Sequence, residues 1–482
     1  MTDTGWQSPL STRYASPAMQ RLWGEAHRIG QWRRVWLALA EAEQELGVAI
    51  PGGALEEMRA HLDDADVETA AAFEKRFRHD VMAHVHAFGE QAPAARPYLH
   101  LGATSAFVTD NADVLIMRDA LGLVLSRLLD LIATLRSFAE RRATLPCLAY
   151  THFQPAQLTT VGKRATLWLQ DFALDLEAID HLLATLRLQG CKGTTGTQAS
   201  FLELFGGDHH AVRELERRIT AKLGGDRVFA VTGQTYPRKA DAQVLDVLSG
   251  VAQSAAKFAV DLRLLQHEGE LLEPFESEQI GSSAMAYKRN PMRAERIGAL
   301  ARHVISLQAN GAHTAAAQWL ERSLDDSANR RLTLPEAFLS VDAILLLAGN
   351  IAAGLEVREG AIGRHVAEQM PFMVTERWLM LAVQAGGDRQ ALHEVIRRHS
   401  LAAADSVAAG EPNDLLDRLV RDGAFDAVKQ SRLEEQLDPI RYVGRAPEQV
   451  AEFVAEYLDP LVSSVRARQT GAGVTELAEL RV

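Results

Sequence analysis

The residues best suited to chemistry lie in one polar stretch, residues 281–291, which reads Gly-Ser-Ser-Ala-Met-Ala-Tyr-Lys-Arg-Asn-Pro. Two hydroxyls, Ser282 and Ser283, follow a glycine, and Lys288 and Asn290 follow within eight residues of the first serine. A serine hydroxyl becomes a useful base only when backbone N–H groups or a nearby ammonium stabilise its alkoxide. The combination therefore suits abstraction of a proton next to a carboxylate. On spacing alone, a solvated turn between two helices explains the same residues equally well.

Length and composition restrict the class of protein. A chain of 482 residues is long enough for two or three domains and a large core. Its net charge of −12 argues against nucleic acids or anionic membranes as partners, so an anionic substrate would need a local cluster of Arg and Lys.

The cysteine content and the lack of long apolar segments indicate where the protein works. Only Cys147 and Cys191 occur, which is too few for a disulfide framework and indicates a reducing cytoplasm. No apolar stretch approaches the roughly 20 residues that span a bilayer, and no leader pattern stands at the amino terminus. We therefore expect a soluble, cytoplasmic protein.

The apolar periodicity predicts an all-α fold with a central bundle of about five long helices. They are expected near residues 112–142, 162–190, 244–273, 293–320 and 334–356, and no strand pair shows a hairpin signal. The third helix is the most regular, because its apolar residues follow a heptad pattern that is typical of packing against other long helices. These residues are Val244, Leu248, Val251, Ala255, Phe258, Leu262 and Leu265. We predict three units: an N-terminal helical domain (1–104), the bundle domain (105–357) and a C-terminal helical domain (358–482).

The segments between these helices carry further candidates, each with an ordinary structural explanation. Thr104 and Ser105 fall in an expected loop, where Thr109 and Asp110 are the better N-cap for the next helix. His152 stands before a Gln-Pro turn, where a lone histidine is usually structural. The arginine-rich run 321–331 is explained most simply by salt bridges on a helix surface.

A metal site is not expected. His79, His84 and His86 lie close together in the sequence, but they lack the i, i+4 spacing of a helical zinc pair. The hydroxyl-rich loop 192–198 lacks the spacing of a nucleoside triphosphate site.

Seven motifs together resemble the fumarase/aspartase superfamily, and within it the adenylosuccinate lyase family, especially its eukaryotic-type branch. The motifs are residues 8–14, 78–80, 151–155, 192–200, 233–236, 281–291 and 324–331. They occur over essentially the whole chain, and the Tyr-Lys-Arg-Asn-Pro form of the serine loop is the most specific. One departure is Ala286, where the family usually has proline. Losing a proline gives a loop more conformational freedom, typically about 0.4–1 kcal/mol.

The resemblance implies a fold, a reaction and a set of roles. The reaction is elimination of fumarate from adenylosuccinate to give AMP, and from succinylaminoimidazole carboxamide ribotide, without a metal or organic cofactor. It implies a homotetramer whose active sites draw on three subunits, and a serine loop that closes over the substrate as a lid. Ser282 resembles the base and His152 the acid, with His79 assisting. Lys288 and Asn290 would stabilise charge on the succinyl carboxylates. The implied substrate contacts are Thr104, Ser105, Thr151 and Gln234 at the carboxylates, Arg13, Tyr14, Arg322, Ser327 and Arg331 at the phosphate, and Arg78, His79, Asp80 and Arg296 around the purine and ribose.

Two alternatives remain open on the sequence. Another lyase of the superfamily, such as argininosuccinate lyase, would share the serine loop and the histidine but would not need a phosphate cluster. A catalytically silent member would use the fold as a structural protein. The presence of Ser282, His152 and Lys288 disfavours this second alternative.

Overall fold

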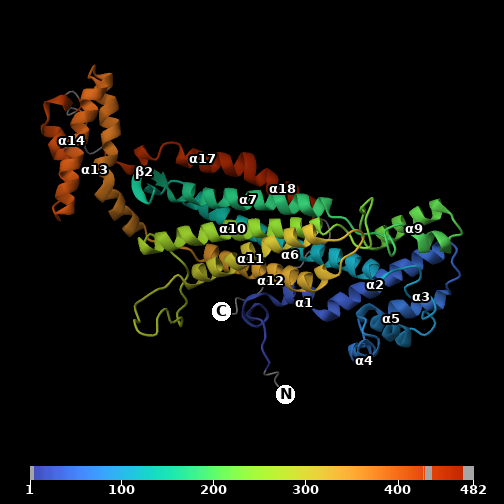
Figure 1. Ribbon diagram of the computed structural model, residues 1–482. Helices are drawn as coiled ribbons and strands as arrows, with labels where there is room; N and C mark the ends of the chain where they lie inside the picture. The colour runs from blue at the N-terminus through green and yellow to red at the C-terminus, as the bar shows by residue number, and fades with distance from the viewer. Residues whose placement is uncertain (1–4, 427, 429–436, 470–482) are drawn as a thin grey trace.

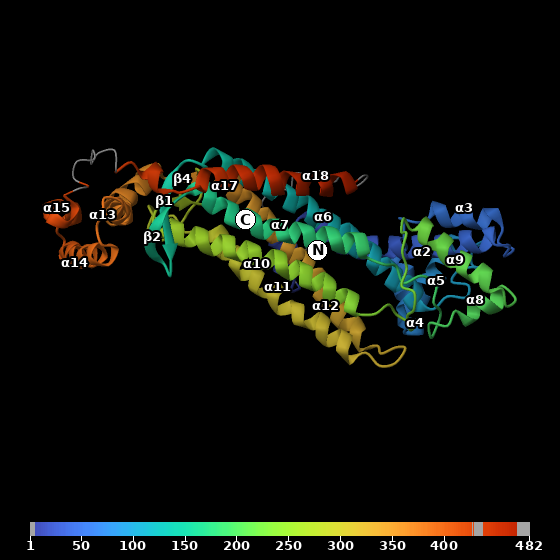
Figure 2. The same ribbon diagram turned by 90° about the horizontal axis from the view of Figure 1, so that it is seen from above.

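Five long helices form the centre of the molecule. The computed structural model describes residues 5–426, 428 and 437–469. Within them, the long helices are α6 (Ser105–Arg141), α7 (Val161–Thr185), α10 (Lys239–His267), α11 (Met292–Ala317) and α12 (Asp325–Ala353). They lie side by side as an elongated bundle in which α6 packs on α7 and α12, and α10 packs on α7, α11 and α12 (Figures 1 and 2). The predicted all-α fold with a bundle of five long helices is confirmed.

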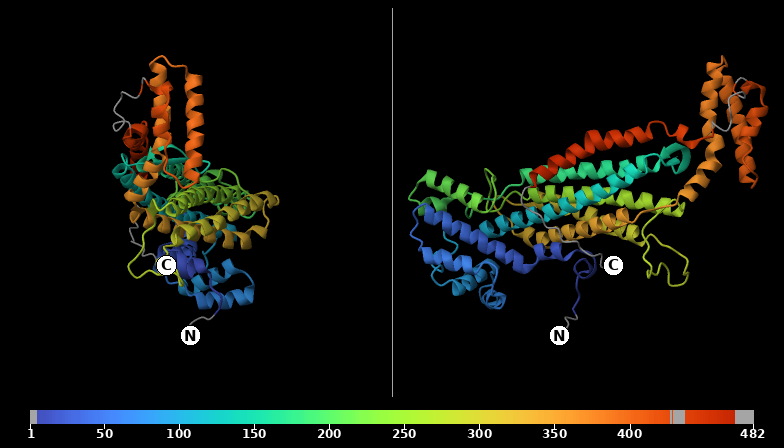
Figure 3. Two further views of the ribbon diagram at one scale, coloured as in Figure 1. Left: turned by 90° about the vertical axis from the view of Figure 1, so that its left-hand side faces the viewer. Right: turned by 180° about the vertical axis from the view of Figure 1, so that it is seen from behind.

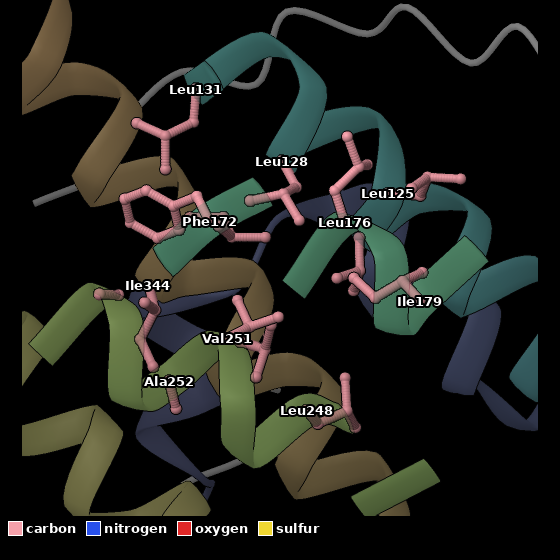
Figure 4. Packing of buried hydrophobic residues seen from close by; sticks show 14 of the residues in the cluster. Leu125, Leu128, Leu131, Phe172, Leu176, Ile179, Leu248, Val251, Ala252 and Ile344 are labelled. Atoms are coloured by element: carbon pink, nitrogen blue, oxygen red, sulfur yellow. The ribbon is translucent and has the colours of Figure 1, made fainter. Parts of the chain in front are cut away.

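The predicted heptad stripe of α10 faces the core. Its first six apolar residues are fully buried, and Leu265 is nearly so. Figure 4 shows Val251 of α10 within a cluster that includes Leu128 of α6, Phe172 of α7 and Ile344 of α12. Burying one such aliphatic or aromatic side chain contributes about 1.5–3 kcal/mol, so the shared core is the main source of stability for the bundle.

Helix α12 has a longer apolar run than we expected from the sequence. By length and composition alone, α12 is long and apolar enough to cross a membrane, and it is the one such helix among the described residues. However, 72% of its apolar window is buried inside the protein. Its hydrophobicity is therefore accounted for by its position in the core.

Shorter helices cover the two ends of the bundle. At one end lie α2 (Glu25–Glu45), α3 (Gly52–Ala60), α4 (Val67–Phe77) and α5 (Asp80–Gln91), together with α8 (Ala199–Leu204) and α9 (His209–Lys222). The segments η1 (Leu10–Tyr14) and α1 (Pro17–Trp23) lie along the bundle against α12 (Figure 1). From the other end project α13 (Glu359–Gln384), α14 (Arg389–Ala408), α15 (Leu415–Arg421) and η2 (Gly423–Phe425) (Figure 1). After η3 (Pro439–Tyr442), the segments α17 (Ala446–Glu452), η4 (Phe453–Leu458) and α18 (Asp459–Arg468) return along α7 (Figure 2). The division at 104/105 and 357/358 stays a prediction.

A β-hairpin corrects the expectation that no strands pair. Strand β1 (Pro146–Thr151) runs antiparallel to β2 (Gln154–Thr160), and a second short pair joins β3 (Leu271–Leu272) to β4 (Glu356–Val357). The hairpin turn consists of His152 and Phe153, whose φ angles are +54° and +57°. Turns of this kind favour Asn-Gly, because both central residues need a positive φ. The turn lacks that signal, so the sequence did not reveal it.

Three predicted helix starts were too late; that of α10, at Lys239 where a start near 244 was expected, differs least. Helix α6 begins at Ser105, and Asp110 does not cap it, because the Asp110 carboxylate accepts hydrogen bonds from the Tyr236 amide (3.0 Å) and from Arg238 (3.0 and 3.1 Å). Helix α12 begins at Asp325 and includes Pro335, whereas a start near 334 was expected. For α6, a buried ion pair between segments distant in the sequence replaces the local cap that the sequence suggested. For α12, Asp326 keeps a local contact with Arg322 and adds a buried one with the distant Arg238.

Candidate active site

The loop at residues 281–291 holds the Ser282 hydroxyl in a polar environment. Its Oγ accepts hydrogen bonds from the backbone N–H groups of Met285 (3.1 Å) and Ala284 (3.4 Å). Backbone N–H donors of this kind stabilise negative charge on an oxygen, which is the support that a serine needs to act as a base.

Gly281 lets the two ends of this loop meet. The Asn290 side-chain amide donates to the Gly281 carbonyl oxygen at 2.7 Å. A Cβ on Gly281 would lie 2.1 Å from the Lys288 carbonyl oxygen, so no larger residue fits without moving the backbone. The close approach places Ser282, Lys288 and Asn290 on one small loop. The Lys288 ammonium is exposed and has no carboxylate partner among the residues that the structure describes, which leaves it available for an anionic substrate.

Arg296 links this loop to the N-terminal segment. It lies near the start of α11, directly after the loop, and its guanidinium carbon lies 5.6 Å from the centre of the Tyr14 ring. Tyr14 ends the short helix η1, which packs on α12 and also carries the exposed Arg13. We call Ser282, Lys288, Asn290, Arg296 and Tyr14, with Arg13, the loop group.

A second set of candidates gathers where α6 begins. His79 caps α5, because its Nδ1 accepts a hydrogen bond from the Met82 amide (3.4 Å), while its Nε2 lies 3.4 Å from the Ser105 hydroxyl. Thr104 precedes α6 and makes no side-chain capping bond in the described structure, so its hydroxyl can serve a ligand. Free N–H groups and the helix dipole attract anions at such an end. Arg78 stands next to His79 in a left-handed conformation, with φ +56°.

Asp80 and Arg331 join this second set. The Arg331 guanidinium donates to Asp80 at 2.7 Å and brings the start of α12 next to α5. Burial opposes ionisation of Asp80, but the hydrogen bonds from Arg331 and the Val81 amide outweigh it and lower its pKa. Asp80 is therefore a carboxylate at neutral pH, and it holds Arg331 in place.

Arg322 and Ser327 line a cavity of about 140 Å³ beside Arg331. Arg322 contacts both oxygens of Asp326 at 3.0 Å, and the same carboxylate accepts a hydrogen bond from Arg238 at 2.6 Å. Asp326 and Arg238 are almost completely buried. A rigid ion-pair network therefore positions Arg322, in contrast to the simple helix-surface salt bridges that the sequence favoured.

Gln234 belongs to the same end of the bundle. Its side-chain amide donates to the Thr194 carbonyl oxygen at 2.9 Å, and its backbone N–H donates to the Glu321 carbonyl oxygen at 2.9 Å. It therefore connects the loop 192–198 to the segment before α12. We call this end of the molecule the α6 group; its members are Arg78, His79, Asp80, Thr104, Ser105, Gln234, Arg322, Ser327 and Arg331.

The sequence missed the residues that hold the α6 group together. Besides Asp110, Asp326 and Arg238, the buried Arg330 bonds to Asp241 (2.6 Å), to the Tyr236 hydroxyl (2.6 Å) and to Asp113 (2.9 Å). Their signal was charge within helices that are otherwise apolar, except for Tyr236 and Arg238, which precede α10.

Thr151 and His152 form a third set, at the exposed tip of the β1–β2 hairpin. The hairpin follows the C-terminal end of α6, whereas the α6 group lies at its start. With 37 residues at 1.5 Å each, α6 separates them by about 55 Å. The hairpin and the loop 281–291 lie at the same end of the bundle but on opposite faces (Figures 1 and 3). One chain therefore does not bring the three sets of predicted residues together.

No cluster of three or more His, Cys, Asp or Glu side chains that could hold a metal ion occurs within the described ranges. What the site offers instead is a supported serine, a histidine and several cations. This set suits removal of a proton beside a carboxylate and departure of a protonated leaving group.

Comparisons with known proteins place the chain in a class. A family model described as "Lyase" matches residues 20–306. The crystal structure of 3-carboxy-cis,cis-muconate lactonizing enzyme from Pseudomonas putida superposes with a TM-score of 0.80 at 25% identity, covering 95% of this chain and 99% of that one. A fumarate lyase from Mesorhizobium sp. BNC1 shares the fold, with a TM-score of 0.78 at 24% identity over 94% of this chain and 98% of that one. The protein is thus a lyase with the fumarase/aspartase fold.

The family within this class follows from closer relatives. A model described as "Adenylosuccinate lyase C-terminus" matches residues 371–453. The chain is 50% identical to an adenylosuccinate lyase of Saccharomyces cerevisiae over 93% of this chain and 94% of the yeast protein. It is 46% identical to that of Schistosoma mansoni, over 96% of both chains. The chain belongs to the adenylosuccinate lyase family, as the motifs predicted.

Proposed function

We propose that this protein eliminates fumarate from adenylosuccinate to give AMP, and that it also cleaves succinylaminoimidazole carboxamide ribotide in purine biosynthesis. The observation that carries the proposal is the loop 281–291, where Ser282 accepts two backbone hydrogen bonds and where Lys288 is exposed and has no carboxylate partner within the described part of the chain. Family membership supports the choice of substrate. Two free, buried thiols, Cys147 and Cys191, agree with work in a reducing cytoplasm.

In the proposed mechanism, Ser282 removes the proton next to a succinyl carboxylate. The electron pair passes into that carboxylate, where Lys288 and Asn290 stabilise the developing charge. The electron pair then returns to form the C=C bond of fumarate as the C–N bond breaks, and His152 protonates the departing nitrogen. The free hydroxyl of Thr104 and the N-terminal end of α6 suit the other carboxylate, and Arg322 and Arg331 suit the phosphate.

The three separated groups support an assembly of several chains. About 55 Å of α6 lies between the hairpin tip and the α6 group, so a complete site requires residues from neighbouring copies. The long helices also expose large apolar side chains: Leu167 and Leu174 on α7, Val260 and Leu264 on α10, and Ile305 on α11. Apolar faces of this kind mark contact surfaces, so we include the homotetramer with shared sites in the proposal.

Ultraviolet-monitored turnover of adenylosuccinate by the purified protein tests the activity. We expect AMP and fumarate from the wild type and losses of about 100-fold or more in Ser282→Ala and His152→Ala. Ser283→Ala is the matched control for the serine, because it removes an exposed neighbouring hydroxyl. His209→Ala, at an exposed residue at the start of α9, is the control for the histidine. Both controls should keep wild-type rates.

Three outcomes would contradict the proposal. Turnover of argininosuccinate in place of adenylosuccinate would identify the sister lyase. Binding of AMP without turnover of either substrate would identify a silent member. Equal losses in Ser282→Ala and Ser283→Ala would remove the special role of Ser282.

Mixing two inactive variants tests the shared site. If Ser282 and His152 of one site come from different chains, an equal mixture of the two alanine variants, dissociated and reassembled, should regain about a quarter of the sites. No recovery, with mixed oligomers demonstrated by mass spectrometry, would place both residues in the same chain's site.

A further inference from the structure

A buried carboxylate lies behind the hairpin that carries His152. Glu270, directly before β3, is fully buried, and three different elements contact it. Its Oε1 accepts a hydrogen bond from the Tyr150 hydroxyl of β1 (3.4 Å) and lies 3.0 Å from His365 Nδ1 of α13. Its Oε2 lies 3.7 Å from the guanidinium of Arg164 on α7. Glu270 thus connects the hairpin to the bundle and to the C-terminal helices.

Two of these contacts act on the same strand. Arg164 donates a hydrogen bond to the Leu148 carbonyl oxygen of β1 while its other terminal nitrogen faces Glu270. Tyr150, two residues further along β1, donates to Glu270. Burial, and then the negative charge of Glu270, raise the pKa of Tyr150, so its hydroxyl remains protonated and able to donate. Strand β1 is therefore held at two points two residues apart, the Leu148 backbone carbonyl and the Tyr150 side chain.

The contact continues to the hairpin tip. The ring of Tyr150 packs against that of Phe153, with 5.6 Å between their centres, and Phe153 is the neighbour of His152 in the turn. The pairing of the strands is irregular between Ala149 and Tyr150, and Pro155, opposite Tyr150, has no N–H to donate. The tip therefore receives little support from the strand ladder itself.

The turn also needs external support. His152 and Phe153 both adopt the left-handed region, which costs a residue other than glycine about 1–2 kcal/mol each. Residues in such conformations persist only when the surrounding structure holds them. One set of described contacts that meets this need from inside the protein runs through Tyr150 to Glu270, and a second joins Gln157 of β2 to Glu376 of α13 at 2.6 Å.

We propose that Glu270 and Tyr150 are positioning residues that hold the hairpin tip, and with it His152, in the orientation needed to protonate the leaving group. Neither residue reaches the substrate; both act through His152. The kinetic part of this inference rests on the proposed function, whereas the mechanical part, the support of the hairpin, does not.

Two variants and a control separate positioning from general stability. Tyr150→Phe removes only the hydroxyl and keeps the ring on Phe153, while Glu270→Gln keeps the shape of the side chain. We expect kcat to fall about 10- to 100-fold in both, as for misplacement of a reacting group by about 1 Å, with little change in KM. Glu43→Gln is the matched control, because Glu43 is an equally buried glutamate on α2, far from the hairpin in the chain. It should keep the wild-type kcat.

A double-mutant cycle asks whether the effect passes through His152. In the His152→Ala background, Tyr150→Phe and Glu270→Gln should cause no further loss of kcat, because the group that they orient is gone. Losses that multiply with that of His152→Ala would overturn the proposal. So would a KM increase with kcat unchanged.

Hydrogen–deuterium exchange provides a readout without turnover. Amides of residues 146–160 should exchange at least about 10-fold faster in both variants, while the α2 peptides exchange as in the wild type. Unchanged exchange in the hairpin, or faster exchange throughout the protein, would overturn the inference. If the wild type fails to cleave adenylosuccinate but the hairpin exchange still rises selectively, the proposed function fails and the support role stands. Should Glu270→Gln not fold, Tyr150→Phe alone decides the outcome.

Discussion

Replacing Gly281 by alanine should open the loop 281–291 without unfolding the protein. The new Cβ would lie 2.1 Å from the Lys288 carbonyl oxygen and 3.1 Å from the Phe275 ring. The oxygen belongs to the backbone and cannot rotate away. Carbon–oxygen contacts in proteins rarely fall below about 3 Å, so the two ends of the loop must separate by roughly 1 Å.

The expected effect falls on catalysis more than on stability. Opening the loop breaks the bond from Asn290 to the Gly281 carbonyl oxygen, worth about 0.5–1.5 kcal/mol; once the opening has relieved the clash, the alanine stabilises by about 0.4–1 kcal/mol through the unfolded state. These contributions nearly cancel. Displacing Ser282 from Lys288 by about 1 Å should lower kcat about 100-fold, which corresponds to about 2.7 kcal/mol of activation free energy.

Turnover and thermal unfolding, measured on the same preparations, test this reasoning. Gly122→Ala on α6 is the matched control, because a Cβ there would meet nothing within 4 Å. It should keep wild-type activity and gain up to about 1 kcal/mol as a helical alanine. A Gly281→Ala enzyme with kcat within twofold of the wild type would refute the claim that the close approach sets the loop geometry.

Three further predictions concern other parts of the chain. Ala286→Pro should leave the chemistry intact and change loop order or product release; identical hydrogen exchange in residues 281–291 together with identical kinetics would argue against it. Burial raises the pKa of Glu43 from 4.5 to about 8, so the folded protein keeps a proton that the unfolded chain releases, and stability should fall as the pH rises from about 4.5 to 8, by up to about 1.4 kcal/mol per unit. Calorimetry of Glu43→Gln should show a shallower decline over that range, and parallel slopes would count against the assignment. Burial also raises the pKa of Cys147 to about 11, and both cysteines are fully buried, so neither should react with a thiol reagent at pH 8 until the protein is denatured; rapid modification of the native protein would contradict this.

Sequence reasoning succeeded where the signal is local. The apolar stripe of α10 depends only on residues three and four apart, and it predicted which side chains are buried. The start of α6, in contrast, depends on contacts between residues far apart in the sequence. Asp110 has the side chain of an N-cap, but its partners Tyr236 and Arg238 lie more than 120 residues away, and they place it inside the helix. Periodicity carries no information about such pairs.

The candidate site shows the same limit in another form. Motifs identified residue types such as Ser282 and Lys288, and the loop geometry that joins them is encoded within eleven residues. The location of His152 is different, because a His-Phe turn gives no hairpin signal and the hairpin depends on contacts from α7, α13 and Glu270. The length of α6 keeps the hairpin far from the α6 group. Each motif covers only a few residues, so no motif could predict this separation.

The left-handed turn at His152 and Phe153 also sets stability against turnover at one position. Asparagine tolerates a positive φ better than phenylalanine does, and Phe153 is 45% exposed, so Phe153→Asn would relieve strain while giving up little buried surface. A laboratory selection for heat resistance alone should therefore accept asparagine at this position. A selection for turnover should retain phenylalanine, because its ring is the contact through which Tyr150 reaches the tip. The two selections would diverge at a residue that takes no part in the chemistry.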